Sequence, residues 1–155
     1  MSSERVGQWL GNGLRARTVA RCAADANDVR LVRLLAQHCR RENAHQLGTV
    51  ASPSGTVLGS TRFTQADLDD LAAREVAAWS GISVWQAGSA IAVADVLCTD
   101  LGATLDAVAA GRLDLARARV LVEAVSDLTG GLRRRVEKVL LDQLPPGPDA
   151  GHRGH

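Results

Sequence analysis

The sequence predicts an all-α fold, a single domain of five to six helices, and three observations support this prediction. Ala and Leu, two strong helix formers, account for 25 and 20 of the 155 residues, against 2 Ile and 1 Phe. Apolar residues recur at intervals of three or four, and no alternating pattern of the strand type persists beyond a few positions. Gly or Pro separates these stretches, as is usual at helix ends. The length suits one domain with a real core.

Three parts are expected along the chain. Residues 1–26 form a partly ordered N-terminal segment, residues 27–144 form the helical domain, and residues 145–155 form a disordered tail. Pro145 and Pro146 stop the last helix, and the residues after them have nothing to bury. Inside the domain, residues 48–59 are rich in Gly, Ser and Thr, which predicts a flexible connection.

The first helix is expected over residues 27–42, with Asn27 or Asp28 as its N-cap. Its apolar residues fall on one stripe, which we expect to be buried: Val29, Val32, Leu35, Ala36 and Cys39.

The second helix begins at Thr64, with Asp67 three positions later, and ends at Ser80 and Gly81; the third helix begins after Ser83. Thr64 and Ser83 carry the hydroxyl groups that cap helix N-termini. The buried stripe of the second helix is expected to contain Leu68, Leu71, Ala72, Val76 and Trp79, and that of the third Val84, Ala87, Gly88, Ile91, Ala94 and Leu97.

Three further helices complete the prediction. One covers residues 100–110 and ends at Gly111, the next follows Asp114 as its cap, and the last begins within residues 129–132. The side chains expected to face the core are Leu101, Leu105 and Val108; Leu115, Ala118, Leu121, Val122, Val125 and Leu128; and Leu132, Val136, Val139, Leu140 and Leu144.

Residues 74–83 have the pattern of the corner in a helix-turn-helix, with Ala at the fourth position before the turn Gly and an apolar residue after it. The helix that follows offers only Ser83, Gln86 and Ser89 as polar groups, and the 37 residues between Arg74 and Arg112 hold no Lys or Arg. Base readout relies on Arg, Lys, Asn and Gln. The pattern therefore favours a helical corner used for packing.

A DNA-binding role is the main alternative, and it would depend on arginines elsewhere. The net charge of +1 alone gives no reason to expect a nucleic-acid partner. One face of the first helix and residues 133–135 are nevertheless basic, and the candidate phosphate contacts are Arg30, Arg33, Arg40, Arg41, Arg133, Arg134 and Arg135. The simpler interpretation is a solvated helix face in an Arg-rich protein.

No catalytic, metal or cofactor site is predicted, and we expect a non-enzymatic protein without cofactors. The acidic cluster Asp67, Asp69 and Asp70 suits the first turn of a helix better than two-metal chemistry. His152 and His155 have ligand spacing, but they lie on a Gly-rich tail that would not hold a metal. No nucleophile elbow, P-loop or dinucleotide fingerprint occurs.

The chain is expected to lie in the cytoplasm, away from the membrane. The three cysteines, Cys22, Cys39 and Cys98, are an odd number without a CxxC pair, which favours reduced, packed thiols. No uncharged apolar run reaches 18 residues, and the N-terminus has no signal-peptide pattern.

Three stretches resemble a large actinobacterial family, the domain of unknown function called the 13E12 repeat family. They are EVAAWSGIS (75–83), LGATLDAVAAGRLDLARARVLVEAV (101–125) and VEKVLLDQLP (136–145), within residues 74–144. The GRLDLARARV run is the most specific of these signals. In two places the chain differs from the family pattern: Arg117 stands where many relatives have His, and the third helix lacks the arginines that relatives carry there.

The resemblance implies the helical region that precedes an HNH endonuclease module, not the nuclease itself. The paired histidines and Asn of an HNH site are not found in the sequence. We therefore expect an interaction or positioning module that binds protein, either itself or a related chain. A DNA-binding module and the remnant of a truncated nuclease gene are the alternatives.

Overall fold

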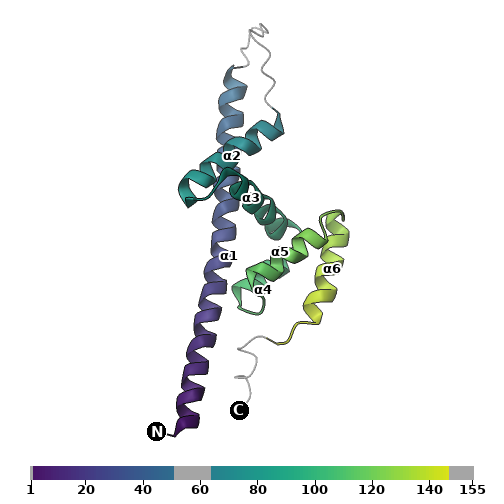
Figure 1. The fold of residues 1–155 in the computed structure, drawn as a ribbon. Helices are drawn as coiled ribbons and strands as arrows, with labels where there is room; N and C mark the ends of the chain where they lie inside the picture. Colours follow the sequence, from purple (N-terminus) through teal and green to yellow (C-terminus); the bar gives the residue numbers. More distant parts are fainter. Residues whose placement is uncertain (1, 51–63, 147–155) are drawn as a thin grey trace. The chain divides into compact units, whose positions relative to one another are not determined.

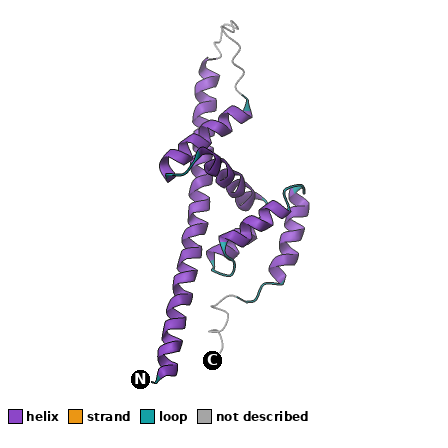
Figure 2. Cartoon of the chain, viewed as in Figure 1, coloured by secondary structure: helices purple, strands orange, loops and turns teal. Residues whose placement is uncertain are grey.

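The computed structural model describes residues 2–50 and 64–146, and these residues form six helices without a strand (Figures 1 and 2). The all-α prediction is therefore confirmed. Contacts between residues divide the chain into two compact units. The terminal unit comprises Met1–Asp28 with Val96–His155, and the central unit comprises Val29–Asp95.

The first helix, α1, spans Ser3–Val50 and is far longer than the predicted 27–42. Asn27 and Asp28, expected as N-caps, lie in its interior. Polar capping residues also occur on exposed helix faces, and the Ala-rich residues before Asn27 have high helix propensity. The pattern therefore placed the start of this helix at the wrong residue. Of the predicted connection, residues 48–50 belong to the helix, and residues 51–59 lie outside the described part, as does the predicted tail beyond Pro146.

The central unit packs α2 (Gln65–Ser80) and the greater part of α3 (Val84–Thr99) against α1. Small side chains dominate its core, which contains Ala36, Cys39, Ala72, Ala73, Val76, Ala77, Ala87 and Ile91, flanked by Val32 and Leu35. The predicted ends of α2 are confirmed. Thr64 and Asp67 form a reciprocal capping box, and Gly81 closes the helix with φ of 67°.

The terminal unit contains α4 (Gly102–Ala109), α5 (Leu115–Ala124) and α6 (Gly130–Asp142), and α4 contacts both α5 and α6. Its largest fully buried side chains are Leu97, Leu101, Val108, Val125, Thr104 and Cys22. Asp114 caps α5 as predicted, by accepting a hydrogen bond of 2.8 Å from the Arg117 backbone N–H.

Gly111 ends α4 in a conformation that only glycine adopts easily, with φ of 72°. A Cβ at this position would lie 2.8 Å from Cγ2 of Val19 on α1. The predicted helix-ending glycine is thus required twice, by its backbone angle and by the close approach of α1.

The predicted core face of α6 is wrong in part. Leu132, Val139 and Leu140 were expected inside, but their exposed fractions are 45%, 58% and 42%. The buried residue of this helix is Glu137, with 6% of its surface exposed. Its hydrogen bonds to α4 fix the rotation of α6 about its axis, a polar constraint that hydrophobic periodicity does not contain.

Candidate interaction site

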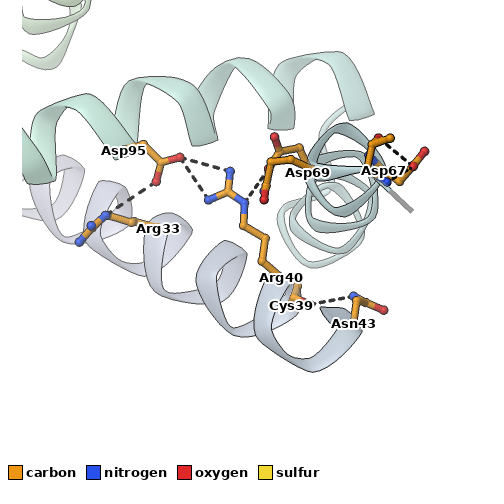
Figure 3. Close-up of polar contacts among 9 residues, drawn as sticks. Arg33, Cys39, Arg40, Asn43, Asp67, Asp69 and Asp95 are labelled. Atoms are coloured by element: carbon orange, nitrogen blue, oxygen red, sulfur yellow. Dashed lines mark hydrogen bonds and ion pairs between the residues drawn. The ribbon is translucent and has the colours of Figure 1, made fainter. Parts of the chain in front are cut away.

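Arg33 and Arg40, two of the arginines proposed to contact DNA, are bound by carboxylates inside the central unit (Figure 3). Arg40 on α1 donates from Nε to Asp69 of α2 at 2.8 Å, and from Nη1 and Nη2 to Asp95 of α3 at 3.2 Å each. Arg33 Nε lies 3.7 Å from the other oxygen of Asp95. We call this set, Arg33, Arg40, Asp69 and Asp95, the arginine clamp. It ties three helices together with charges that are only partly exposed.

Arg133 is also used within the fold. It donates to Asp100 at 2.9 Å and to the carbonyl oxygens of Val125 and Ser126 at 3.1 and 2.7 Å. These carbonyls lie at the C-terminal end of α5, where a cation is favourable. Gly130 makes room for the carboxylate, because a Cβ there would lie 2.9 Å from Asp100 Oδ1.

The remaining candidate arginines are divided between the two units. Arg134 is exposed and lies 3.7 Å from Asp100, Arg30 is half-buried, and Arg41 and Arg135 are exposed. Arg30 and Arg41 belong to the central unit, whereas Arg134 and Arg135 belong to the terminal unit. Of the seven arginines, four form ion pairs with carboxylates of their own unit, namely Arg33, Arg40, Arg133 and Arg134, which weakens the case for a phosphate-binding face.

The helix-turn-helix corner is present in the structure, with α2 and α3 bent by 106° at the break between them. Ser83 and Gln86 cap α3 reciprocally, with hydrogen bonds of 3.0 and 3.1 Å. Two of the three polar groups available for base readout are therefore occupied at the helix start. The geometry matches the motif, but the chemistry does not suit the reading of base edges.

Large apolar side chains surround this corner on its outer side. Trp79, Ile82, Val84 and Trp85 lie within seven consecutive residues and are all exposed, the two tryptophans by 76% and 81%. We call these four residues the corner patch. The expected burial of Trp79 and Val84 is thus wrong: alanines at 72, 73 and 77 set the buried side of α2, and the Trp79 indole N–H donates to Glu75 at 2.9 Å instead. The corner packs inward and also presents an apolar surface outward.

The acidic residues near the start of α2 have structural partners, and of the three only Asp67 lies in the first turn of the helix, where all three were predicted. Asp67 accepts from the Thr64 backbone N–H at 2.6 Å and from its hydroxyl at 2.9 Å, and these bonds lower the pKa of the Asp67 carboxyl. Asp69 belongs to the arginine clamp, and Asp70 pairs with Arg74 at 2.7 Å. Within residues 2–50 and 64–146, no three His, Cys, Asp or Glu side chains gather as a metal site would require. His152 and His155 lie outside these residues.

Glu137 and Thr104 form a buried pair that the sequence pattern did not reveal. Glu137 Oε1 on α6 accepts from the Thr104 backbone N–H at 2.6 Å and from its hydroxyl at 2.8 Å. Thr104 lies in the first turn of α4, whose own N-cap residue, Leu101, makes no side-chain hydrogen bond. Glu137 therefore caps α4 from another helix. The available signal was the missing cap residue, which indicates that some acceptor is needed but not which one.

All three cysteines are free, and two of them, Cys22 and Cys39, are buried. Burial raises the pKa of the Cys39 thiol, and the negative charge of Glu75 raises it further. A raised pKa keeps a thiol protonated and unreactive at neutral pH. The predicted packing role therefore agrees with the surroundings of Cys39.

No protein-family model, curated protein or solved structure matches this chain. Within the described residues, no single helix is long and apolar enough to cross a membrane; α2 and α3 reach that threshold only as a bent pair.

Proposed function

We propose that this protein is a non-catalytic interaction module that binds a helical segment of a protein partner at the corner patch. The single observation that carries the proposal is the exposure of Trp79 and Trp85 on either side of Gly81. Trp is enriched among the residues that dominate binding energy at interfaces. We also infer a reducing, cytoplasmic location, which the three free cysteines support.

The size of the corner patch supports this role. An aromatic side chain can bury roughly 150–250 Å², so two tryptophans with exposures of 76% and 81% present about 300 Å² before their apolar neighbours are added. Apolar patches of roughly 300–600 Å² are the largest on ordinary monomers and are often functional. Full burial of both rings would supply a substantial part of the roughly 800 Å² that each partner contributes to a standard interface.

Charge around the patch indicates the chemistry of the partner. The exposed Glu75 accepts a hydrogen bond from the indole N–H of Trp79, and no Lys or Arg occurs between Arg74 and Arg112. An anionic partner would find no counter-charge from these residues, whereas a cation beside the rings would gain from Glu75 and from the aromatic faces. We therefore propose an amphipathic helix with an apolar face flanked by basic residues as the ligand.

The family resemblance is consistent with this role, because it implies a helical region that accompanies an HNH nuclease. On this proposal the module positions a related chain by binding it. The DNA-binding alternative has less support, since Arg33, Arg40 and Arg133 are engaged by carboxylates or carbonyls within the fold. Neither the resemblance nor the arginines provide a catalytic group, so we propose that the chain acts by binding alone.

The test uses tryptophan fluorescence with a defined peptide. In a Trp9→Phe background, Trp79 and Trp85 are the only tryptophans, so emission reports on the corner patch alone. A designed amphipathic Leu/Lys peptide is titrated into the full chain, and we expect a blue shift with saturation as the rings leave water. An otherwise identical Leu/Glu peptide should bind at least tenfold more weakly.

Variants locate the binding surface, with affinity measured by calorimetry. Trp79→Ser and Trp85→Ser should each weaken binding of the Leu/Lys peptide more than about tenfold, since truncation of a binding hot spot costs about 2 kcal/mol. Leu31→Ser, an exposed residue on α1 of the same unit, is the matched control and should bind as wild type. Equal affinity for both peptides, or unchanged binding by the two Trp variants, would overturn the proposal.

A further inference from the structure

A second apolar surface lies on α6, which belongs to the terminal unit, whereas the corner patch belongs to the central unit. Leu132, Val139 and Leu140 are exposed there, and the half-buried Val136 lies between them. Successive helical residues turn by about 100°, so Val139 lies about 160° from the inward-facing Glu137. The exposed face is therefore fixed on the outer side of the helix by the Glu137–Thr104 bonds.

The spacing along this face is that of a helix–helix seam. Leu132, Val136, Val139 and Gln143 follow one another at intervals of four, three and four residues, with Leu140 beside them. Such a 4-3-4 spacing places one narrow row of side chains along a helix, and a second helix with the same row can interlock with it. We propose that the occupant of this face is α6 of a second copy of the chain, packed antiparallel.

The antiparallel arrangement has one register that uses the whole row. Its two-fold axis passes between Val136 and Val139, so that Val136 of each copy meets Val139 of the other. Leu132 of each copy then meets Gln143 of the other at the two ends. A shift by one heptad in either direction leaves fewer layers in contact, which selects this register.

Charge complementarity selects the same arrangement. Arg135 and Asp142 are exposed, flank the row on the same side, and have no ion-pair partner within the described residues. In the antiparallel register Arg135 of one copy lies beside Asp142 of the other, and the symmetry axis makes this pair twice. In a parallel pair the two copies of Arg135, and likewise those of Asp142, would lie on opposite edges of the seam, so that Arg135 of one copy would not meet Asp142 of the other and the two ion pairs would not form.

The interface is small, because α6 has only 13 residues, about 20 Å of helix. Interfaces of this size are at the low end for specific association and dissociate readily. We therefore expect a reversible monomer–dimer equilibrium that depends on protein concentration.

Sedimentation equilibrium of the full chain over a range of concentrations tests the proposal. The wild type should form a dimer, and Val139→Glu should weaken dimerisation at least tenfold. Val120→Glu is the matched control: Val120 is also exposed and also in the terminal unit, but it lies on α5. Circular dichroism should show unchanged helix content in both variants. A monomer at every concentration, or a dimer unaffected by Val139→Glu, would refute the α6 interface.

A charge exchange tests the register. Arg135→Asp alone and Asp142→Arg alone should each weaken the dimer several-fold, because each places like charges together across the interface. The double variant restores opposite charges and should recover dimerisation. Failure of the double variant to recover would rule out the antiparallel register. The Trp79→Ser variant should dimerise as wild type, which separates this interface from the corner patch.

Discussion

The two units of this molecule differ in what fills their cores. The central unit is built around alanines, with Val76 and Ile91 as its largest aliphatic core residues, whereas the terminal unit buries Leu97, Leu101, Leu105 and Val108. Large apolar side chains are exposed in both units: Leu31, Leu34, Trp79, Ile82, Val84 and Trp85 in the central unit, and Trp9, Leu10, Leu14, Val120, Leu132, Val139 and Leu140 in the terminal unit.

An alanine core lets helices approach closely, but it removes little apolar area from water per residue. The arginine clamp supplies part of the specificity that large side chains would otherwise provide, because its hydrogen bonds connect α1, α2 and α3 at defined positions. The terminal unit has larger packed side chains and uses a buried polar pair, Glu137 and Thr104, for the same purpose. We conclude that core side-chain size and interhelical polar contacts are balanced differently in the two units.

The largest expected effect on stability comes from the removal of a large core side chain. Leu101→Ala removes a fully buried residue of the terminal unit and should lower the free energy of unfolding by about 3 kcal/mol, through lost burial and the cavity left behind. Urea denaturation followed by circular dichroism measures the change. Leu31→Ala removes the same atoms from an exposed site and should change stability by less than about 0.5 kcal/mol. Equal effects at the two sites would contradict the contrast drawn between core and surface.

The buried polar pair comes next. Glu137→Ala leaves the backbone N–H and hydroxyl of Thr104 without their acceptor, and the cost should be about 2 kcal/mol of unfolding free energy. Glu137→Gln keeps an oxygen acceptor and the side-chain volume, so it should lower the free energy of unfolding by clearly less than Glu137→Ala. Both are measured by urea denaturation. If Glu137→Gln proved as destabilising as Glu137→Ala, the capping interaction would not be the source of the stability.

The arginine clamp should contribute less, since its carboxylates are partly exposed. Arg40→Ala breaks the hydrogen bonds to Asp69 and Asp95 and should cost about 1–2 kcal/mol, less in high salt. Arg41→Ala, one residue along α1 and exposed, is the control and should be nearly neutral. Thermal unfolding at low and high salt gives both values. An equal loss in the two variants would show that the clamp is not specific.

Local signals in the sequence predicted most helix boundaries. Thr64, Gly81, Gly111 and Asp114 are residues whose backbone or side-chain chemistry suits a helix end, and the structure uses each of them there. Asn27 has the same chemistry but lies within α1, because capping residues are also tolerated on exposed helical faces. Boundary prediction therefore succeeded where a breaker or a capping partner accompanied the cap.

The candidate site was less predictable, because it depends on how each helix is rotated about its axis. The apolar stripe placed Trp79 inside, yet closely packed alanines decide which side of α2 is buried. The pairing of Arg40 with Asp95 joins residues 55 positions apart, which no local pattern encodes. The basic face of the first helix was visible in the sequence, but its use in holding helices together was not.

The smallest expected effect is a pH dependence at the start of α2, where the central unit again relies on a polar contact. The Thr64 backbone N–H and hydroxyl lower the pKa of the Asp67 carboxyl below the usual value of about 3.9. A lowered pKa in the folded state means that the capping box stabilises the helix above about pH 3.9, and that this stabilisation is lost as pH falls through the folded pKa.

The carboxyl carbon shift of Asp67, followed by NMR, should titrate with a midpoint below 3.9, and Thr64→Ala should move that midpoint upward. The first turn of α2 should fray over the same pH range in the wild type, whereas Asp67→Asn should remove this part of the pH dependence. A midpoint at or above 3.9 in the wild type would mean that the hydrogen bonds from Thr64 to the Asp67 carboxylate do not form when the protein is in solution.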